Sequence, residues 1–270
     1  MVQDTAIPAY AEVLREESRR WKRQLLGSSP LLLLVLACAW GTGLLDARRL
    51  IQGVPSVARL AGEMLPPDFR NAMDWVKPLF QTVLMSVAST ALALALSLPL
   101  GCLAASNVVP NRAVYWGARG ILNALRGIPE LILGIFFVAA VGFGVLPGVL
   151  ALGLHSAGMV GKFFAEAMEH VDQGPVEAVR ATGATPLQVV AHGILPQILP
   201  QMADVAIYRW ELNFRASTVI GLVGAGGIGF ELIASLRIMN YREVGAILIV
   251  VFVMVCLIDG LSALLRRRFR

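Results

Sequence analysis

The chain has 270 residues, of which 57% are hydrophobic and only 15% are charged, and its mean hydropathy of +0.70 lies outside the range of soluble domains. Its formal net charge of +5 is explained by basic ends that set orientation in a membrane and meet anionic lipid, so nucleic-acid binding is not required. The composition therefore predicts an all-α integral membrane protein.

Six apolar stretches are long enough to cross about 30 Å of hydrocarbon as helices. They are Leu25–Leu45, Leu79–Ala105, Leu122–Val141, Gly148–Ala167, Ile194–Ile220 and Val244–Leu265. The first is expected to be an anchor, because the charged segment EVLREESRRWKRQ precedes it and no clean cleavage site follows. We expect a polytopic protein with six transmembrane helices, in which a cytoplasmic segment 1–24 precedes a transmembrane domain 25–270.

The distribution of basic residues predicts the topology. Of the 23 Lys and Arg residues, fourteen lie on one set of alternate segments, seven on the other and two inside the fifth span. The richer set includes both ends of the chain, so both termini should be cytoplasmic, and 46–77 and Ser235–Glu243 should face outward. Segment 46–77 has apolar residues at helical spacing, which fits a helix on the outer membrane surface or a contact with an external protein.

Metal and disulfide chemistry have little support in the sequence. Cys38, Cys102 and Cys256 lie in apolar stretches without a CxxC pair, and the three histidines are scattered. No GxxxxGK[ST] phosphate loop is present, so ATP hydrolysis by that route would need another chain. We expect no metal, no catalytic residue and no cofactor on this chain.

The longest polar interruption, 172–193, predicts two short helices joined by a sharp turn. Pro175 fits a first helical position, and Gly183 fits the left-handed residue that ends a helix. Thr185 fits an N-cap followed by Pro186, with Gln188 completing a capping box. The simplest interpretation is a well-capped amphipathic cytoplasmic loop, and the alternative is a docking element.

A second polar feature lies near the cytoplasmic end of the third span. Arg126 and Glu130 flank Pro129, and a proline there leaves a carbonyl without a backbone partner unless another group satisfies it. This pattern fits two interpretations. In one, Arg126 reaches toward lipid headgroups beside a kink, and in the other these residues have a functional role.

The fifth span carries the polar residues that indicate a pathway. A charge at bilayer depth costs at least about 2.5–3.5 kcal/mol, so it must be paired or face water. Glu211 and Arg215 are spaced to pair on one helical face, whereas Asp204 fits Arg209 less well. We therefore expect either a structural ion-pair network or a pathway that meets an anion, formed by Arg209, Glu211, Asn213, Arg215, Ser217 and Thr218.

A glycine-rich loop, 221–232, follows this span. Gly224, Gly226 and Gly229 match the GxGxxG fingerprint of dinucleotide-binding folds, but a polar membrane helix precedes them instead of a strand. We reject that fold and expect Gly224, Gly226, Gly227 and Gly229 to allow irregular backbone beside the pathway.

Three segments resemble one protein family. EAVRATGATPLQVVAHGILP resembles the EAA loop of binding-protein-dependent ABC importer permeases, with Val179 and Gly193 as departures, and LRGIPEL resembles the corresponding segment of the third span. RWELNFRASTVIGLVGAGGIGFEL is similar to the distal half of phosphonate importer permeases, including relatives that take up phosphite.

The resemblance implies a type I ABC permease of the bacterial inner membrane that works by alternating access. It implies a second permease copy, a cytoplasmic ATPase dimer that holds ATP and Mg, and a periplasmic phosphonate- or phosphite-binding protein. The 172–193 loop would be the coupling helix, with docking residues Glu177, Ala178, Arg180, Gly183, Ala184, Leu195 and Pro196.

Other functions remain open at this point. The same architecture serves other solutes such as phosphate or methionine, because EAA elbows and glycine-rich loops are shared across substrates. A membrane-embedded enzyme would need a convergent base, nucleophile or metal set, and a plain anchor would not explain charges at bilayer depth.

Overall fold

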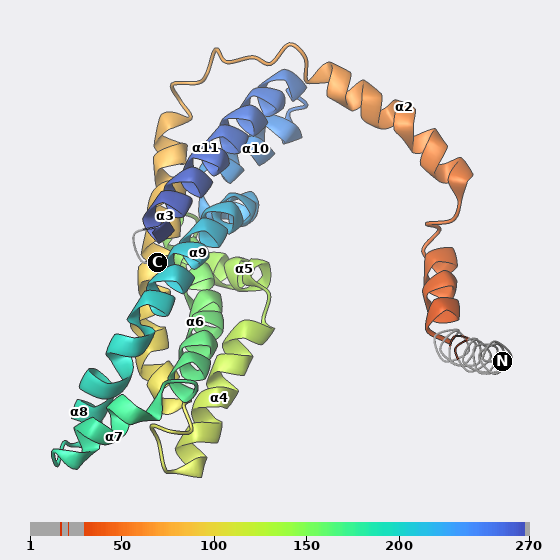
Figure 1. Cartoon of the computed structure of the whole chain (residues 1–270). Helices are drawn as coiled ribbons and strands as arrows, with labels where there is room; N and C mark the ends of the chain where they lie inside the picture. Colours follow the sequence, from red (N-terminus) through yellow and green to blue (C-terminus); the bar gives the residue numbers. More distant parts are fainter. Residues whose placement is uncertain (1–16, 18–20, 22–29, 268–270) are drawn as a thin grey trace, which may run out of the picture. The chain divides into compact units, whose positions relative to one another are not determined.

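The computed structural model describes residues 17, 21 and 30–267, and over that part of the chain it contains helices and no strands (Figure 1). The chain divides into two compact units, residues 1–62 and 63–270. The first unit includes the helix Pro30–Gly41 and most of α2 (Ala47–Glu63).

The second unit is a helical bundle. Its helices are α3 (Val76–Leu103), α4 (Arg112–Gly127), α5 (Glu130–Val141), α6 (Val145–Glu169), α7 (Gln173–Ala181), α8 (Pro186–Val189), α9 (Leu195–Ile220), α10 (Ile228–Arg237) and α11 (Tyr241–Arg267), with π-helical turns at Val190–Ile194 and Gly221–Ala225.

Three helices, α3, α6 and α11, are long and apolar enough to cross a membrane. Two bent pairs raise the number to five if each pair is one span: α4 with α5, bent by 87°, and Pro186–Ala225 with α10, bent by 56°. These helices lie at the second to sixth expected spans, but the third expected span is a sharply broken helix pair and not one straight helix. The first expected span includes the twelve-residue helix Pro30–Gly41, and its residues 25–29 lie outside the described part, so six spans stay a prediction.

Helix α6 is the centre of the bundle, and it packs against α3, α4, α5 and α9. Its apolar window is 67% buried, against 33% for α3 and 28% for α11. Glycines on α6 let the neighbouring helices approach it closely. A Cβ on Gly158 would lie 2.7 Å from the backbone nitrogen of Arg126, and a Cβ on Gly153 would lie 2.6 Å from the side chain of Leu92. Close helix approach of this kind is how helices associate in lipid.

Helix α2 shows the amphipathic pattern expected within segment 46–77. Ile51, Val54 and Val57 are all more than 60% exposed, and the basic residues of this helix are Arg48, Arg49 and Arg59. Its helical conformation is confirmed, whereas its place on the outer membrane surface stays a prediction.

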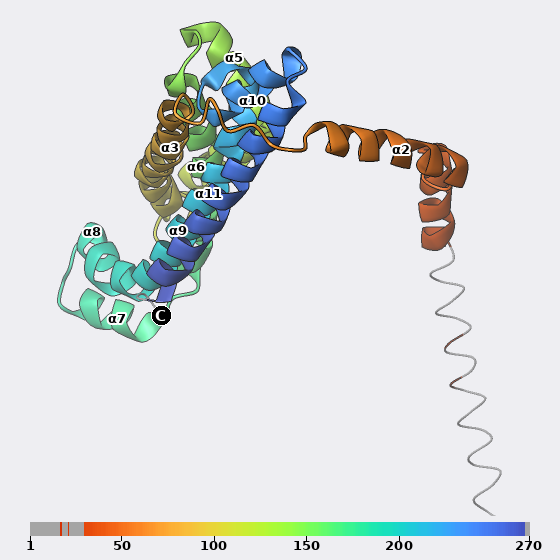
Figure 2. The same cartoon turned by 90° about the horizontal axis from the view of Figure 1, so that it is seen from above.

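The segment before α3 is fastened to the start of α11 within the second unit. The amides of Asn71 and Asn240 donate to the two carboxylate oxygens of Glu243, at 3.1 and 2.7 Å. The backbone N–H of Asp68 also donates to the carbonyl of Arg242. These bonds close one end of the bundle, while α7 and α8 project from the other end (Figure 2).

Candidate functional site

The polar loop forms the predicted helix, glycine elbow and second helix. Helix α7 ends at Ala181, Gly183 has a φ of +78°, and α8 begins at Pro186 with a complete capping box between Thr185 and Gln188. One detail of the prediction is wrong. Asp172 caps α7 by accepting from the Gly174 N–H at 3.0 Å, so Pro175 is the third helical residue, although it still lies in the first turn, where N–H groups need no intrahelical partner.

The elbow is anchored on one side and exposed on the other. Val176 and Val189 are buried on the inner side of the elbow. Gly193 lets the π-helical turn Val190–Ile194 approach the backbone of α7, since a Cβ on Gly193 would lie 3.2 Å from Val176 Cα. The predicted docking residues Glu177, Ala178, Arg180 and Gly183 are exposed, Ala184 is half-buried, and Leu195 and Pro196 start α9. Leu187, the second residue of α8, is 79% exposed.

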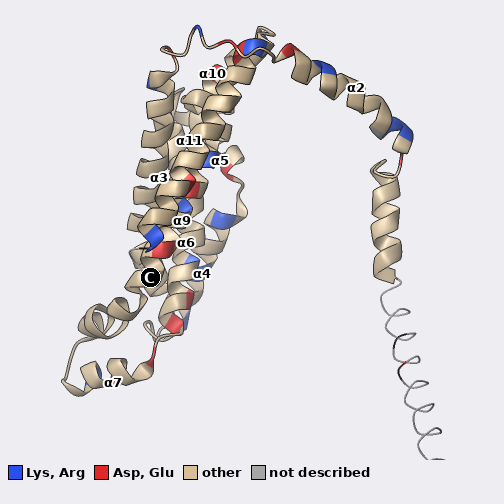
Figure 3. Cartoon of the chain, turned by 45° about the horizontal axis from the view of Figure 1, so that its top comes forward, with Lys and Arg blue, Asp and Glu red and all other residues tan. Residues whose placement is uncertain are grey.

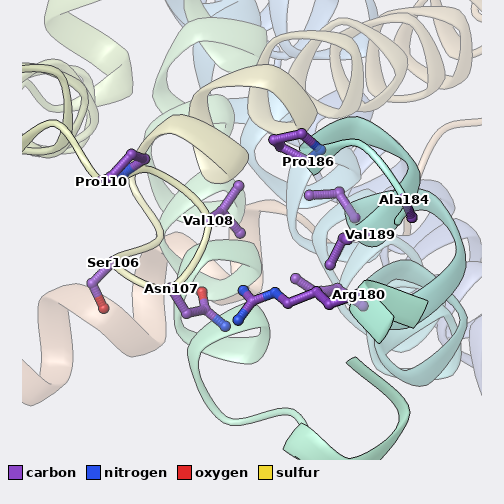
Figure 4. Close-up of a pocket in the computed structure, with 10 residues that line it drawn as sticks. Ser106, Asn107, Val108, Pro110, Arg180, Ala184, Pro186 and Val189 are labelled. Atoms are coloured by element: carbon purple, nitrogen blue, oxygen red, sulfur yellow. The ribbon is translucent and has the colours of Figure 1, made fainter. Parts of the chain in front are cut away.

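A cavity of about 410 Å³ lies between this elbow and the turn that joins α3 to α4 (Figure 4). Arg180 extends across it toward Asn107, and Val108, Pro186 and Val189 supply apolar walls. The amide nitrogen of Asn107 donates to the Met168 carbonyl at 2.6 Å, but its buried oxygen has no partner among the described residues. This cavity could not be predicted from the sequence, because Asn107 lies some seventy residues from the elbow.

A chain of buried hydrogen bonds runs through the middle of the bundle. Arg209 Nε donates to Ser156 Oγ at 2.7 Å, and Ser156 Oγ donates to Asn213 Oδ1 at 2.8 Å. Asn213 Nδ2 donates to Thr90 Oγ1 at 2.9 Å, and Thr90 donates to the Ser86 carbonyl. The network joins α9, α6 and α3, and it satisfies both ends of the Asn213 amide, which is fully buried.

Arg209 is the buried cation of this network. Its side chain is only 7% exposed in the bundle, and its other hydrogen bond within the described residues runs from Nη1 to the sulfur of Met159 at 3.4 Å. Over residues 30–267, no carboxylate lies within ion-pair distance of it, and Asp204 leaves one buried oxygen without a partner instead of reaching it. The expected poor fit of Asp204 to Arg209 is confirmed.

Glu211 and Arg215 belong to a second cluster, on the face of α9 that meets α11. The Arg215 guanidinium lies 2.8 Å from Glu211 and 2.8 Å from Asp259, and Arg266 lies 2.8 Å from the other oxygen of Glu211. The charged positions lie along the bundle helices in Figure 3. The predicted pairing of Glu211 with Arg215 is confirmed, and each residue also has a second partner, Asp259 for Arg215 and Arg266 for Glu211.

Asp259 and Arg266 were missed by sequence reasoning, although they had a detectable signal. They are seven residues apart on an otherwise apolar helix, which places them on one face. The hydroxyls of Ser217 and Thr218, which we expected to be available donors, are used within α9. Ser217 donates to the Phe214 carbonyl and Thr218 to the Arg215 carbonyl, each at 2.7 Å.

The glycine-rich loop has the irregular backbone expected of it. Gly224, Gly226 and Gly227 have φ values of +101°, +75° and +73°. Gly229 serves a different purpose: it lies in the first turn of α10, where a Cβ would collide with the Thr218 carbonyl oxygen. The start of α10 is capped from α3, because Thr82 Oγ1 accepts from the Ile228 N–H at 2.9 Å.

The two charged residues that flank Pro129, Arg126 and Glu130, have different surroundings. Arg126 is exposed and has no ion-pair partner in the described range, whereas Glu130 lies 3.3 Å from the imidazole of His155 on α6. The other imidazole nitrogen lies 3.0 Å from the Ile128 carbonyl. Histidine 155 gave no signal in the sequence beyond its isolation in an apolar span.

Comparison with known proteins identifies the family of the chain. The chain is 59% identical over 98% of its length, and over 97% of the relative, to the phosphite transport system permease protein PtxC of Stutzerimonas stutzeri. It is 43% identical over 79% of its length, and 40% of the relative, to the phosphate-import permease protein PhnE of Mycolicibacterium smegmatis.

Among solved structures, the inward-facing MetNI methionine ABC transporter matches with a TM-score of 0.64 and 24% identity, over 73% of this chain and 96% of that one, which supports the fold. A family model for the binding-protein-dependent transport system inner membrane component matches residues 97–270, a range that holds the elbow, the buried network and the glycine-rich loop. The chain belongs to the family of binding-protein-dependent transport system inner membrane components.

Proposed function

We propose that this chain is the transmembrane permease of an ATP-driven importer that moves phosphite or a phosphonate across the inner membrane by alternating access. The observation that carries the proposal is the 59% identity to a phosphite permease over nearly the full length of both chains. The matched region covers 98% of this chain, a range that includes the buried network.

The chemistry of the buried network fits an anion. The Arg209 guanidinium keeps N–H groups that donate to no oxygen of the described residues, and its charge has no carboxylate partner there. A buried, unpaired cation is costly, and a substrate oxyanion would supply the missing counter-charge when it enters the bundle. The planar fork of arginine is suited to two oxygens of one phosphorus atom.

The partners follow from the exposed elbow. We infer that α7, Gly183 and α8 dock on a cytoplasmic ATPase that holds ATP and Mg, with Glu177, Ala178, Arg180 and Leu187 at the contact. Two coupling elbows are needed for two ATPase subunits, so the permease would work as a homodimer or beside a homologous permease. A periplasmic binding protein would deliver the substrate to the opposite face.

Alternating access gives the ATPase a way to move the substrate. ATP binding would close the ATPase dimer, draw the elbows together and open the bundle outward, and hydrolysis would return it. Such coupling requires that nucleotide and substrate each prefer one of the two states. The polar contacts across α3, α6 and α9 are the ones that would differ between the states.

The test is reconstitution in lipid with a partner ATPase and a periplasmic binding protein. Labelled phosphite or methylphosphonate should be taken up only with ATP, and unlabelled phosphite should compete better than phosphate or methionine. Phosphate is the important competitor, because one of the relatives is a phosphate-import permease. Stronger competition by phosphate or methionine than by either proposed substrate would contradict the assignment.

A further inference from the structure

The elbow leaves the bundle after α6 and returns to it at the start of α9, and one side chain joins its two ends. Gln197, in the first turn of α9, is half-buried at the base of the elbow. Its Oε1 accepts from the backbone N–H of Asp172 at 3.1 Å, and its Nε2 donates to the Asp172 carbonyl at 3.1 Å. Nε2 also donates to the Gly193 carbonyl at 2.7 Å. We call this group the Gln197 bracket.

The bracket uses every hydrogen that the Gln197 amide can donate. A side-chain amide has two N–H donors and one carbonyl acceptor, and here the two donors meet two backbone carbonyls while the acceptor meets one N–H. A flipped amide would face its oxygen toward two other acceptors, so only one orientation fits. The bracket therefore depends on an amide of this length at position 197.

The bracket fastens the first helix of the elbow to α9. Asp172 is the N-cap of α7, so its two bonds to Gln197 fix the residue at which α7 begins. Helix α7 packs against α8 and the π-helical turn before α9, where Gly193 lies close to the Val176 backbone. Pro186–Ala225 is one helical run from α8 through α9. Both helices of the elbow are thus attached to the run that carries Arg209.

The end of α6 is fastened to a different part of the bundle. The Glu169 carboxylate accepts from the Ser106 N–H at 2.8 Å and pairs with Arg119 at 2.9 Å, which ties the last turn of α6 to α4 and the α3–α4 turn. Between this tie and the bracket lie only His170 and Val171. A few residues at the end of an element are enough to form a hinge between two rigid bodies.

We propose that Gln197 is a positioning residue for coupling, which makes the elbow move with α9 and leaves residues 170–171 as the hinge toward α6. This inference rests on the function proposed above, in which the elbow docks on the ATPase. Arg209 lies about 18 Å further along α9, at 1.5 Å per residue, so a displacement of the elbow would reach the buried network through one helix. Without the bracket, α7 would turn about its junctions while α9 stays in place.

One variant removes the bracket while it keeps the shape of the side chain. Gln197→Met has a similar length and helix propensity but no strong donor or acceptor. Gln197→Glu keeps an acceptor for the Asp172 N–H, but as a carboxylate it has no donor for the two carbonyls. The matched control is Gln201→Met, because Gln201 is exposed one turn further along α9 and its side chain makes no hydrogen bond within residues 30–267.

Hydrogen exchange measures the bracket itself. The complete complex in lipid is exchanged without substrate, and peptides that cover residues 170–176 are followed by mass spectrometry. The Asp172 N–H has its acceptor on Gln197 in the parent, so its exchange should be about tenfold faster in Gln197→Met and unchanged in Gln201→Met. Parental exchange of this segment in Gln197→Met would overturn the proposal.

Transport measures the coupling. Uptake per ATP hydrolysed should fall about tenfold in Gln197→Met and in Gln197→Glu, because the ATPase would still hydrolyse ATP while less of its movement reaches α9. A merely structural role would lower membrane abundance, or lower uptake and ATPase activity together, and leave the ratio at the parental value, which would overturn the proposal. If Gln197→Met does not insert, the ratio in Gln197→Glu decides.

Failure of the proposed function would be seen separately. A parent protein that takes up neither phosphite nor a phosphonate with ATP would contradict the substrate assigned above. The exchange experiment contains no substrate, and the coupling ratio would then be measured with the solute that the parent does transport.

Discussion

Replacement of Arg209 by glutamine should separate the structural role of this buried side chain from its role toward an anion. The structural cost has two opposing parts. Loss of the 2.7 Å bond from Nε to Ser156 removes a charge-assisted hydrogen bond of about 1.5–3 kcal/mol. Removal of the charge relieves about 2.5–3.5 kcal/mol of insertion cost. The two nearly cancel, so the amount of protein in the membrane should hardly change.

The functional cost has no such compensation. A bidentate guanidinium contact with an oxyanion is worth at least the same 1.5–3 kcal/mol, so Arg209→Gln should lower uptake about 10- to 100-fold. Arg209→Lys keeps the charge but loses the fork, and its uptake should be intermediate.

The assay is uptake of labelled phosphite and of a phosphonate, divided by membrane abundance of the permease, for each variant in the same cells. Ser156→Ala is the matched control, because it removes the hydroxyl that holds Arg209 while it leaves the cation in place. Parental uptake by Arg209→Gln would refute the reasoning, and the charge at this position would then be structural.

Three further predictions concern the elbow, the ion cluster and the topology. Gly183→Val should cost on the order of 1–2 kcal/mol locally, because φ is +78° there, and it should lower substrate-stimulated ATPase activity and uptake without loss of insertion. Arg215→Gln should reduce membrane abundance only slightly, because Arg266 still pairs with the buried Glu211 carboxylate. The double change of Arg215 and Arg266 to glutamine should reduce membrane abundance strongly. Equal abundance of the single and the double variant would contradict this prediction. A cysteine at Leu60 should react with an impermeant thiol reagent from the periplasm and one at Thr185 should not, and the opposite pattern would invert the topology.

Local features could be predicted from the sequence because neighbouring residues determine them. The capping box at Thr185 and the left-handed Gly183 depend on a few consecutive residues, and both are confirmed. A kink at Pro129 was predicted, but the size of the bend, 87°, could not be obtained from the local sequence.

Long-range pairing was beyond what the sequence pattern could provide. Glu211 and Arg215 were correctly paired because they are one turn apart on one helix. Their other partners, Asp259 and Arg266, lie on α11, and nothing in the spacing of α9 identifies them. The same holds for His155, whose contact with the Ile128 carbonyl depends on which turn of α6 meets the α4–α5 break. An isolated histidine in an apolar span is ambiguous until that contact is known.

The ion cluster between α9 and α11 also has a consequence for how the chain is made. Arg215 and Asp259 are 44 residues apart, so α9 leaves the ribosome and enters the insertion machinery before Asp259, the second carboxylate that pairs with Arg215, has been translated. During that interval Glu211 lacks Arg266, and each charge of an incompletely paired cluster costs at least about 2.5–3.5 kcal/mol in lipid. Helix α9 is therefore expected to remain beside the translocon until α11 arrives. Nascent chains that stop before α11 would carry incompletely paired charge in the membrane.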